Sequence, residues 1–577
     1  MRVALAVAVL ALPLRAHAQG DVTPADRPTA VEVAAKRSAE RAVRSFEQRR
    51  MRLLPNVPSS FGGSGDIIIG RYRYAAGEAD DLTPPPAEPP EITELRRSLL
   101  RTLDSALRTA PTDAWIRSRL VWYAIEGGDT ALAVSAADGC QDDELPWWCD
   151  ALLGLALHAS HDFLGGERAF DRALSAMPDS TRCRWTDVGI LLDGDAEGLV
   201  ERRPCEDRAA LDARLWWLAD PFHSVEGNEL RSEHFARQTF AVLHDRWRAS
   251  HPLGWGSDMR EIILRYAWPV AWSRDRTRER SPTQAGYFLA ITGHEPNPAY
   301  DFFPDAAALE SPFDASDASW RPKRSRATTH YAHPRAAPLQ PLRHQIARFR
   351  RGDSLLIVGA WNATSDTLFN RTLGRVALII SSGDGRAPRM AISESGASRG
   401  ALMLLAPNAD YLASLELFAG NSRAAARARR GLRASAPAAE LAVSDILLLE
   451  PGEQPRTLPE AVQRLLPDEE LDAEARVTLY WEVYGLLPET PPRVTVSVSR
   501  VRASRARRLA EKLGLRDEPQ TVEMQWETDA VPAATAVGSV TLDLRDRSSG
   551  TWRVSITVTA PDGAKATAHR DLILGSR

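Results

Sequence analysis

Four acidic and imidazole side chains near the middle of the sequence could together perform acid–base chemistry. They are Glu233 and His234, followed further along the chain by Asp258 and Glu261. Paired carboxylates act as general acid and general base in enzymes that hydrolyse glycosidic polymers. A hydrolase of an extracellular polymer, with these four residues as its catalytic site, is therefore our alternative hypothesis for the function.

Histidines at three-residue spacing form two further candidate sites. His158 and His161 could bind a metal together, but we favour a hydrogen-bonded pair. Pro334 disfavours a helical pairing of His330 and His333, so these two are expected to be ordinary loop residues. We expect no metal site and no cofactor. We also expect neither a nucleophile elbow nor a phosphate-binding loop, since the glycine-rich stretch 61–65 lacks the necessary lysine.

The composition excludes some classes of function. The 577 residues include 72 Lys and Arg against 76 Asp and Glu, a net charge of −4, which lacks the basic excess of a nucleic-acid binder. Because arginine dominates the basic set throughout, we expect its two clusters in solvated loops or on helix faces; these are Arg427, Arg429 and Arg430, and Arg505, Arg507 and Arg508. The partner we expect is a protein or peptide.

The first residues indicate export. Residues 1–18 combine a positive start at Arg2, an apolar stretch, and a small-x-small cleavage pattern at Ala16-His17-Ala18, as in a signal peptide. The apolar stretch is too short to cross a bilayer, which takes about 20 residues. No later segment is apolar for long enough either, so we expect a periplasmic or secreted protein without a transmembrane segment after cleavage.

The cysteines fit an oxidising compartment. The chain has four, Cys140, Cys149, Cys183 and Cys205, and an even number in an exported protein favours two disulfides. Of the three possible connectivities we favour the local pairs Cys140–Cys149 and Cys183–Cys205. Zinc binding is disfavoured because no Cys-x-x-Cys spacing occurs.

The pattern along the chain predicts an α+β multidomain protein. Residues 19–90 form a leading region that ends in a proline-rich linker, and residues 91–250 read as a helical domain. In that domain a set of small and apolar residues has tetratricopeptide-like spacing: Leu153, Gly154, Leu157, Gly166, Phe170, Ala173 and Pro178. Short strands separated by turns then predict two antiparallel β-sandwiches, at 346–437 and 438–577.

The segment 251–345 carries the most distinctive motif. Gly254-Trp255 is followed by Ser257-Asp258, and then by Arg265-Tyr266 and Pro269. This pattern resembles the GWxTD domain of exported bacterial proteins, with serine in place of threonine and Ala267 in place of a turn glycine. In that family the signature is followed by a strand. The biochemical role of the family is undefined, so the resemblance implies no catalytic residues.

From the residues themselves we expect Ser257 and Asp258 to form a local cap or turn. Ile262, Leu264 and Tyr266 are expected on one face of a strand. The flanking tryptophans Trp255, Trp268 and Trp272 are interpreted as core packing, with a peptide- or glycan-binding groove as the alternative. Ala267 should adopt a different backbone conformation from a glycine with positive φ. Our leading hypothesis is an exported, non-enzymatic interaction or envelope scaffold protein.

Overall fold

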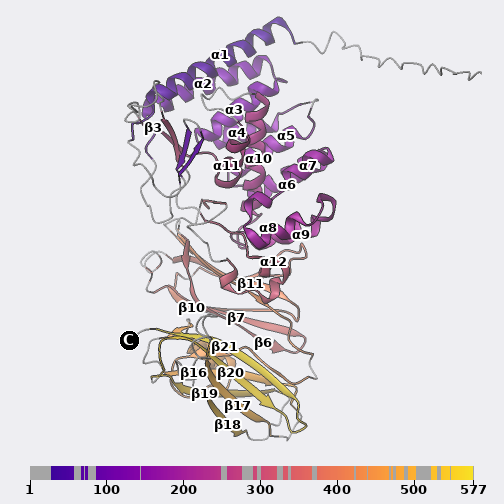
Figure 1. Ribbon diagram of the computed structural model, residues 1–577, viewed down its shortest axis with the longest axis vertical. Coiled ribbons are helices and arrows are strands. Elements are labelled where there is room, and N and C mark those ends of the chain that lie inside the picture. Colours follow the sequence, from indigo (N-terminus) through magenta and orange to yellow (C-terminus); the bar gives the residue numbers. More distant parts are fainter. Residues whose placement is uncertain are drawn as a thin grey trace, which may run out of the picture.

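The computed structural model describes residues 28–575 with gaps. The longer gaps are 58–65, 76–85, 248–255, 276–289, 295–299, 321–328, 502–520 and 529–534. The predicted signal peptide, Gly254, Trp255 and the second arginine cluster therefore lie outside the described residues. Most helices and one small sheet, which includes β3 (Ala271–Asp275), gather at one end of an elongated molecule, and the larger sheets lie at the other, as the α+β prediction requires (Figure 1). Among the described helices, none is long and apolar enough to cross a membrane.

Ten helices build the helical end of the molecule. They are α1 (Ala30–Leu53), α2 (Pro90–Thr109), α3 (Ala114–Glu126), α4 (Thr130–Asp138), α5 (Trp148–Ala159), α6 (Phe163–Ala176), α7 (Asp179–Trp185), α8 (Gly194–Glu201), α9 (Ala209–Ala219) and α10 (Glu229–Trp247). Several begin at a side-chain cap, for example at Thr29, Asp113 and Asp162, which accept a hydrogen bond from an otherwise unpaired N–H of the first turn. Helix α1 packs along α2, so the helical layer starts at Ala30 instead of at residue 91.

Small residues let the helices approach closely. A Cβ atom added to Gly154 on α5 would lie 2.6 Å from the ring of Phe170 on α6, closer than two carbon atoms can come. Helix α2 buries an apolar stripe at Ile92, Leu99 and Leu103, residues three and four positions apart that share one helix face. These side chains belong to one large core that also includes residues of α3, α5 and α10.

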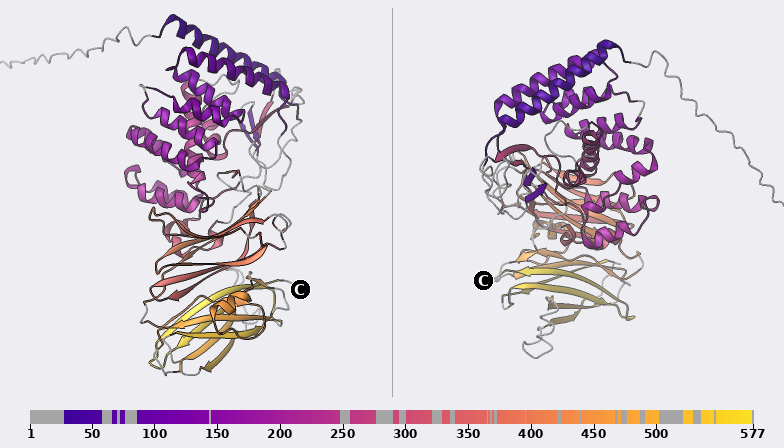
Figure 2. Two further views of the ribbon diagram at one scale, coloured as in Figure 1. Left: turned by 180° about the vertical axis from the view of Figure 1, so that it is seen from behind. Right: turned by 45° about the horizontal axis from the view of Figure 1, so that its top comes forward.

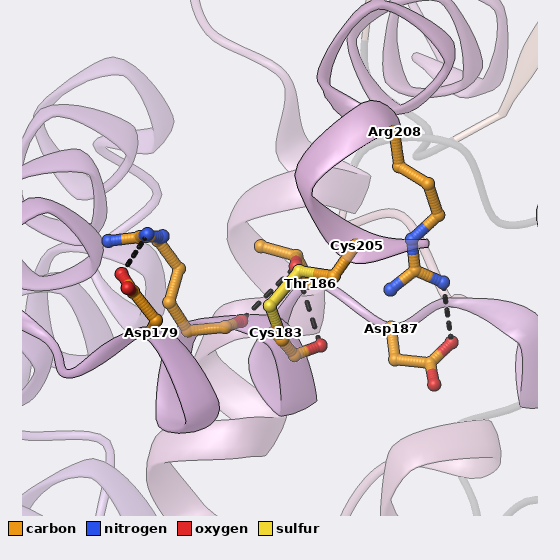
Figure 3. The surroundings of a disulfide bond; sticks show 7 residues. Asp179, Cys183, Thr186, Asp187, Cys205 and Arg208 are labelled. Carbon is orange, nitrogen blue, oxygen red and sulfur yellow. Dashed lines mark hydrogen bonds and ion pairs between the residues drawn. A yellow bond between two sulfur atoms is a disulfide. The ribbon is translucent and has the colours of Figure 1, made fainter. Parts of the chain in front are cut away.

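The two disulfides join the predicted local pairs, Cys140–Cys149 and Cys183–Cys205. The second ties α7 to the segment before α9, and Figure 3 shows the polar contacts beside it. Arg208 lies 3.4 Å from Asp187, and the hydroxyl of Thr186 donates to the carbonyl of Arg182 at 3.1 Å. Both disulfides therefore close short loops inside the helical layer.

The segment with the signature folds differently from our expectation. Ser257–Tyr266 is a helix, α11, and the strand β3 (Ala271–Asp275) begins only after it. The expected strand face of Ile262, Leu264 and Tyr266 is therefore wrong. Ser257 does not cap α11 either, because the N-cap position is occupied by Gly256, which has no side chain to accept a hydrogen bond.

Strand β3 belongs to a small mixed sheet of order β1-β2-β4-β3. Its other members are β1 (Asp66–Ile69), β2 (Tyr72–Ala75) and β4 (Ala290–His294). Because β2 runs parallel to β4, residues of the leading region join the segment that carries the signature. A short helix, α12 (Ala306–Glu310), follows.

Two pairs of sheets form the other end of the molecule (Figure 2). In the first pair, the three-stranded sheet β10-β7-β6 and the five-stranded sheet β5-β12-β11-β8-β9 share one apolar core. Their strands are β5 (Leu339–Pro341), β6 (Arg343–Arg351), β7 (Ser354–Asn362), β8 (Leu373–Ser381), β9 (Arg389–Ser393), β10 (Arg399–Pro407), β11 (Tyr411–Ala419) and β12 (Ala425–Leu432). The side chains alternate along β7 and β11 between the two faces of each sheet, so both sheets contribute to the shared core.

The second pair also shares one core and packs against the first through β14 and β16. Its strands are β13 (Ala442–Val443), β14 (Leu447–Leu449), β15 (Glu470–Leu471), β16 (Arg476–Tyr484), β17 (Arg493–Arg500), β18 (Val522–Glu527), β19 (Thr535–Asp543), β20 (Gly550–Thr559) and β21 (Lys565–Leu574), with the short helix α13 (Leu458–Gln463). Strand β17 is half-buried: Val494, Val496 and Val498 are buried, because alternate side chains of a strand point to the same face.

Buried charges join the helical layer to the first sheet pair. Glu416 on β11 accepts hydrogen bonds from the backbone N–H groups of His223 (3.0 Å) and Ser224 (3.1 Å), which lie between α9 and α10. Arg429 on β12 donates to the carbonyl oxygens of Leu218 and Asp220, each at 2.9 Å. Glu416 and Arg429 are 0% and 1% exposed. We call this contact between the helical layer and β11–β12 the charged joint.

The expected solvated position of the first arginine cluster is therefore wrong. Arg427, Arg429 and Arg430 lie on a strand and not on a solvated loop or helix face. Arg427 donates to the carbonyl oxygen of Pro221 at 2.7 Å, and Arg430 to that of Ile346 at 3.4 Å. Burial, together with the neighbouring charge of Arg429, lowers the pKa of Arg427 to about 9.

Candidate functional site

A small polar pocket lies where α5, α10 and the end of α11 meet the segment 329–334. It has a volume of about 180 Å³. Its lining combines histidine, carboxylate, guanidinium and phenol groups with small apolar walls, from His158, Ala159, His161, Phe163, Glu233, Arg237, Tyr266, Ala267, His330, Tyr331, Ala332 and Pro334. The pocket therefore draws on four stretches of the chain that are far apart in the sequence.

Arg237 on α10 holds the walls of the pocket together. Its guanidinium donates to the carbonyl oxygens of Leu264 (3.0 Å) and Arg265 (2.9 Å), and to that of His330 at 2.7 Å. The last carbonyl groups of a helix have no partner within the helix, so Arg237 satisfies two of them at the end of α11. Its Nε also donates to Glu233 at 2.6 Å. All three of its nitrogen atoms are thus engaged, and Arg237 acts as a positioning residue.

Ala267 ends α11 in a strained conformation. Its φ of 70° and ψ of 177° lie in a region that glycine adopts readily and other residues avoid. Ala267 therefore adopts the positive φ that we expected only for a glycine at this position. The N–H of Ala267 donates to the carbonyl of Ile263 at 3.0 Å, which closes the helix. The strain lies directly at the pocket wall.

The segment 329–334 is fixed at several points. The N–H of His330 donates to the carbonyl of Arg265 at 2.9 Å, and the backbone of Tyr331 pairs with that of Tyr300 in both directions. Beyond the pocket, the Nε2 atom of His333 lies 2.8 Å from a carboxylate oxygen of Glu229, and both side chains are fully buried. The wall formed by this segment is therefore held in place by backbone and side-chain contacts.

His158 and Glu233 form the polar floor of the pocket. Nε2 of His158 lies 2.7 Å from Oε2 of Glu233, and Nδ1 lies 2.9 Å from the hydroxyl of Ser232. The two side chains are 12% and 15% exposed. Burial by itself would raise the pKa of Glu233, but the charge of Arg237 and the hydrogen bond from His158 outweigh it and lower that pKa far below its usual value. Glu233 is therefore a carboxylate that only accepts hydrogen bonds.

Nε2 of His158 donates to Glu233, because this carboxylate can only accept. The hydroxyl of Ser232 shares a hydrogen bond with Nδ1 and also lies 3.0 Å from the carbonyl oxygen of Glu229. Helix α10 thus holds the imidazole from two sides.

Tyr331 contributes to the pocket lining, but its ring packs into the core against Phe302 and His333, each with 6.1 Å between the centroids. The residue is 5% exposed, and within the part of the chain that the structure describes its hydroxyl makes no hydrogen bond. Burial and the nearby charges of Glu229 and Glu233 raise the pKa of this phenol well above its usual value, so it stays neutral.

The four residues of the hydrolase hypothesis have different surroundings. Glu233 lies in the pocket, whereas His234 is buried on another side of α10 and its Nε2 lies 2.8 Å from the carbonyl of Trp185. Glu261 is exposed and accepts from Nε of Arg265 at 2.8 Å. Asp258 is exposed in the first turn of α11 and contacts Ser257 at 3.2 Å. The described contacts do not join these residues into one network.

The second half of the signature forms part of the pocket. The carbonyl of Arg265 accepts hydrogen bonds from Arg237, from His330 and from the hydroxyl of Thr329. The ring of Tyr266 contacts the ring of His330 edge to face, with 5.3 Å between the centroids. Pro269 is buried just beyond. The signature thus places the end of α11 against the segment 329–334.

The described tryptophans of the signature segment pack into the helical core. The ring of Trp268 contacts Trp122 (5.6 Å between centroids), Phe240 (4.6 Å) and His244 (5.0 Å). Trp272 lies beside it at 5.2 Å. Both side chains belong to the large helical core, as expected for aromatic residues that fill volume.

A metal site and a serine nucleophile are the other kinds of functional centre to be considered. Among the described residues, no group of three or more His, Cys, Asp and Glu side chains could hold a metal ion. One Gly-x-Ser-x-Gly stretch, residues 396–400, connects the strands β9 and β10. A nucleophile elbow instead joins a strand to a helix, so this stretch lacks the context that activates the serine.

The sequence pattern singles out most of the pocket residues but does not group them. It indicates structural roles for His158, His161 and His330, and it gives no indication that Tyr331 belongs to a site. The four-residue spacing of Glu233 and Arg237 on a helix was the local hint, because such pairs face each other. Nothing in the sequence placed residues 158, 233, 266 and 331 side by side.

Comparisons with known proteins add no family to this picture. No family model matches the chain, and no curated protein matches it. Solved structures with local similarity include the PmoD soluble domain from a Methylocystis species (13% identity, 22% of this chain and 89% of that chain, TM-score 0.14). A segment of a bacterial ice-binding adhesin (10% identity, 41% and 67%, TM-score 0.14) and the chicken CNTN1 FN1–FN3 domains (11% identity, 41% and 68%, TM-score 0.15) are similar to the same low degree. At these TM-scores the similarities carry no functional argument.

Proposed function

We propose that this protein is an exported, non-enzymatic binding protein that holds a side-chain-sized group of a protein or peptide partner in the pocket beside His158 and Glu233. The single observation that carries the proposal is the pocket itself. Its walls are fixed in advance by Arg237 and by the segment 329–334. Preformed walls lower the entropic cost of binding.

The size of the pocket favours a small group. Pockets for drug-sized ligands span roughly 300–1,000 Å³. The volume here is about 180 Å³, which suits one side chain or chain end of a larger partner. The remainder of such a partner would rest on the helical layer, where the tetratricopeptide-like pair α5 and α6 lies beside the pocket.

The rest of the molecule supports a scaffold role under this proposal. We interpret the two sheet pairs as β-sandwiches that act as spacers, and the segment 251–345 as a GWxTD-like unit. The disulfides and the absence of a membrane-spanning helix among the described residues are compatible with a periplasmic or secreted protein. The charged joint makes the helical layer and the first sheet pair one continuous body.

The observed contacts favour binding over hydrolysis. A pair of catalytic carboxylates must flank one bond, within about 10 Å of each other. Among the described contacts, Glu233 is held by Arg237 and His158, and Glu261 by Arg265. Glu233 is thereby held as an anion, which does not suit a general acid.

A screen of small compounds tests the proposal. The full chain is mixed with a panel of N-acetyl amino acids, their amides and monosaccharides, and unfolding temperatures are measured. We expect at least one compound to raise the unfolding temperature of the wild type but not that of Ala332→Trp, in which a large ring fills the pocket. Ala34→Trp, at an exposed position of α1, is the matched control and should respond like the wild type. If no compound distinguishes the wild type from Ala332→Trp, the proposal is wrong.

A further inference from the structure

We infer that β10 is an interaction surface at which two copies of this chain pair edge to edge, antiparallel and centred on Met403. None of its residues lines the pocket, so the inference stands independently of the proposed function. Three observations carry it: the unpaired backbone of this edge, its apolar side chains, and the way in which its residues match one another across a two-fold axis.

Strand β10 is an edge strand with one free side. In the sheet β10-β7-β6 it pairs with β7 over 9 residues without a bulge. Just after the strand, the N–H of Asn408 donates to the carbonyl of Asp353 at 3.0 Å, so the even-numbered residues bond towards β7. Backbone groups in an antiparallel pair point alternately to the two sides, so those of Ala401, Met403 and Leu405 point away from β7. Within the described part of the chain, no hydrogen bond reaches these outward groups.

The other edge of the same sheet is closed. On β6, the N–H of Arg348 donates to a carboxylate oxygen of Asp445 at 3.0 Å, and the N–H of Arg350 donates to the hydroxyl of Tyr484 at 2.9 Å. Residues of the second sheet pair therefore already satisfy outward backbone groups of β6. Because this sheet can grow at one edge only, its pairing gives a closed pair of copies and not an open filament.

The side chains of β10 favour contact with protein over contact with water. Residues 401–406 are all apolar, and Arg399 is the one charged residue of the strand. Met403 and Leu405 are 47% and 55% exposed. Edge strands of natural proteins usually prevent pairing by a charge, a proline or a bulge within the strand. Strand β10 has none of these between Arg399 and Pro407, so it lacks the features that keep an edge unpaired.

The residues of β10 match one another when a second copy pairs with the strand about a two-fold axis. With Met403 opposite Met403, the large side chain of Leu405 lies opposite the small one of Ala401. Arg399 lies opposite Pro407, so no like charges meet, and the missing N–H of proline ends the pairing there. The residues that face each other in the centre are those with outward backbone groups, so each pair exchanges both N–H···O bonds. This self-matching selects a second copy as the occupant of the edge.

The contact between the two sheet pairs continues into this surface. Ala401 packs against the apolar cluster that includes Leu458 and Ala461 of α13. In the paired arrangement, Leu405 of one copy lies beside Ala401 of the other and therefore at the margin of this cluster. The exposed leucine thus exchanges water for an apolar neighbourhood.

Cysteine cross-linking of the full chain tests the register. The four native cysteines are paired with one another, so an added thiol has no free native partner. We expect Met403→Cys to form a disulfide-linked dimer under mild oxidation, because the Cα atoms of such opposed residues lie about 5.5 Å apart, within the range of a disulfide. Leu405→Cys is the matched control on the same face. At about 3.4 Å per residue its two copies lie about 14 Å apart along the strands, so it should stay unlinked. Adding Ala401→Cys to Leu405→Cys should restore the link.

A charged substitution tests the association itself. Met403→Lys places two ammonium groups opposite each other and removes apolar contact, so it should raise the dissociation constant of the dimer at least about tenfold in sedimentation velocity. Ile392→Lys, at an exposed apolar position of β9, is the matched control and should associate like the wild type. Both positions are exposed, so both variants should keep the circular dichroism of the folded chain.

A wild type that has the mass of one chain at every concentration overturns the inference. So does a dimer that persists unchanged in Met403→Lys, because the copies would then meet at another face. Equal cross-linking of Leu405→Cys and Met403→Cys overturns the register and with it the inference. If compounds bind in the pocket of a wild type that stays a single chain, the proposed function stands without the pairing of copies.

Discussion

Replacing His234 by glutamine should make the helical layer markedly less sensitive to acid. His234 on α10 is 3% exposed, and its Nε2 donates to the carbonyl of Trp185 at 2.8 Å. Its other ring nitrogen has no hydrogen-bond partner within the part of the chain that the structure describes. A second proton on the ring would therefore have no acceptor. Glutamine can keep the bond to Trp185 and cannot be protonated.

The size of the effect follows from the pKa of His234. Burial, together with the charges of Arg237 and Arg231, lowers it from 6.5 to about 4, despite the opposing bond to Trp185. The unfolded chain takes up the proton near pH 6.5, whereas the folded protein resists until about pH 4. The folded state therefore loses stability as the pH falls through this window, by about 2 kcal/mol at pH 5 and about 3 kcal/mol below pH 4.

Urea unfolding at pH 7.5 and pH 5 measures the difference, with circular dichroism of the helices as the signal. Other groups titrate in both proteins. The relevant quantity is therefore the change in unfolding free energy between pH 7.5 and pH 5 in the wild type, minus the same change in His234→Gln. His569→Gln, at an exposed position of β21, is the control and should behave like the wild type. NMR of the labelled imidazole rings reads the titration of His234 directly.

An equal loss of stability in the wild type and His234→Gln would refute this reasoning. The imidazole signal of His234 is identified by its absence from the spectrum of His234→Gln. If that signal titrated near pH 6.5 in the wild type, the reasoning would also be refuted. Either result would mean that water or a rearranged acceptor reaches the second ring nitrogen.

Three further predictions concern the strain at the pocket, the charged joint and the disulfides. Ala267→Gly should raise the unfolding free energy by about 1 kcal/mol in urea unfolding, because glycine adopts the φ of 70° without strain; a loss of stability would show that the methyl group packs usefully. Glu416→Ala should destabilise the protein by about 3 kcal/mol or more, because it leaves two buried N–H groups without their acceptor and Arg429 without its nearby negative charge. Glu416→Gln should cost less, and equal effects of the two variants in limited proteolysis and urea unfolding would count against this account. Replacing Cys183 and Cys205 by serine should lower the unfolding free energy by about 3 kcal/mol, as expected for a loop of 22 residues, and an unchanged unfolding midpoint without reductant would contradict it.

Local patterns predicted much of the fold. Strands β7, β11, β16 and β20 lie where alternating or continuous apolar runs between turns predicted them, because side chains on a strand alternate between its two faces. The disulfides join cysteines that are close in sequence, the pairs that short loops favour. The error at α11 is instructive. The run Ile262-Ile263-Leu264 suggested a strand, but Met259, Ile262 and Ile263 also have helical spacing and are the buried face.

The arginines of β12 and the pocket could not be predicted in this way. A basic cluster is usually solvated, and only the docking of α9 and α10 on the sheet encloses Arg429 and supplies its carbonyl acceptors. In the same way, His158, Glu233 and Tyr331 come together only after α5 and α10 have packed and the segment 329–334 has returned to them.

By itself, the sequence determined the order of helices and strands and the pairing of the cysteines, because both depend on neighbours along the chain. The tertiary structure alone decided which charges are buried and which side chains share the pocket. The physical reason is that burial and hydrogen bonding depend on contacts between distant segments. Such contacts hold Glu233 as a carboxylate and set the acid sensitivity of His234.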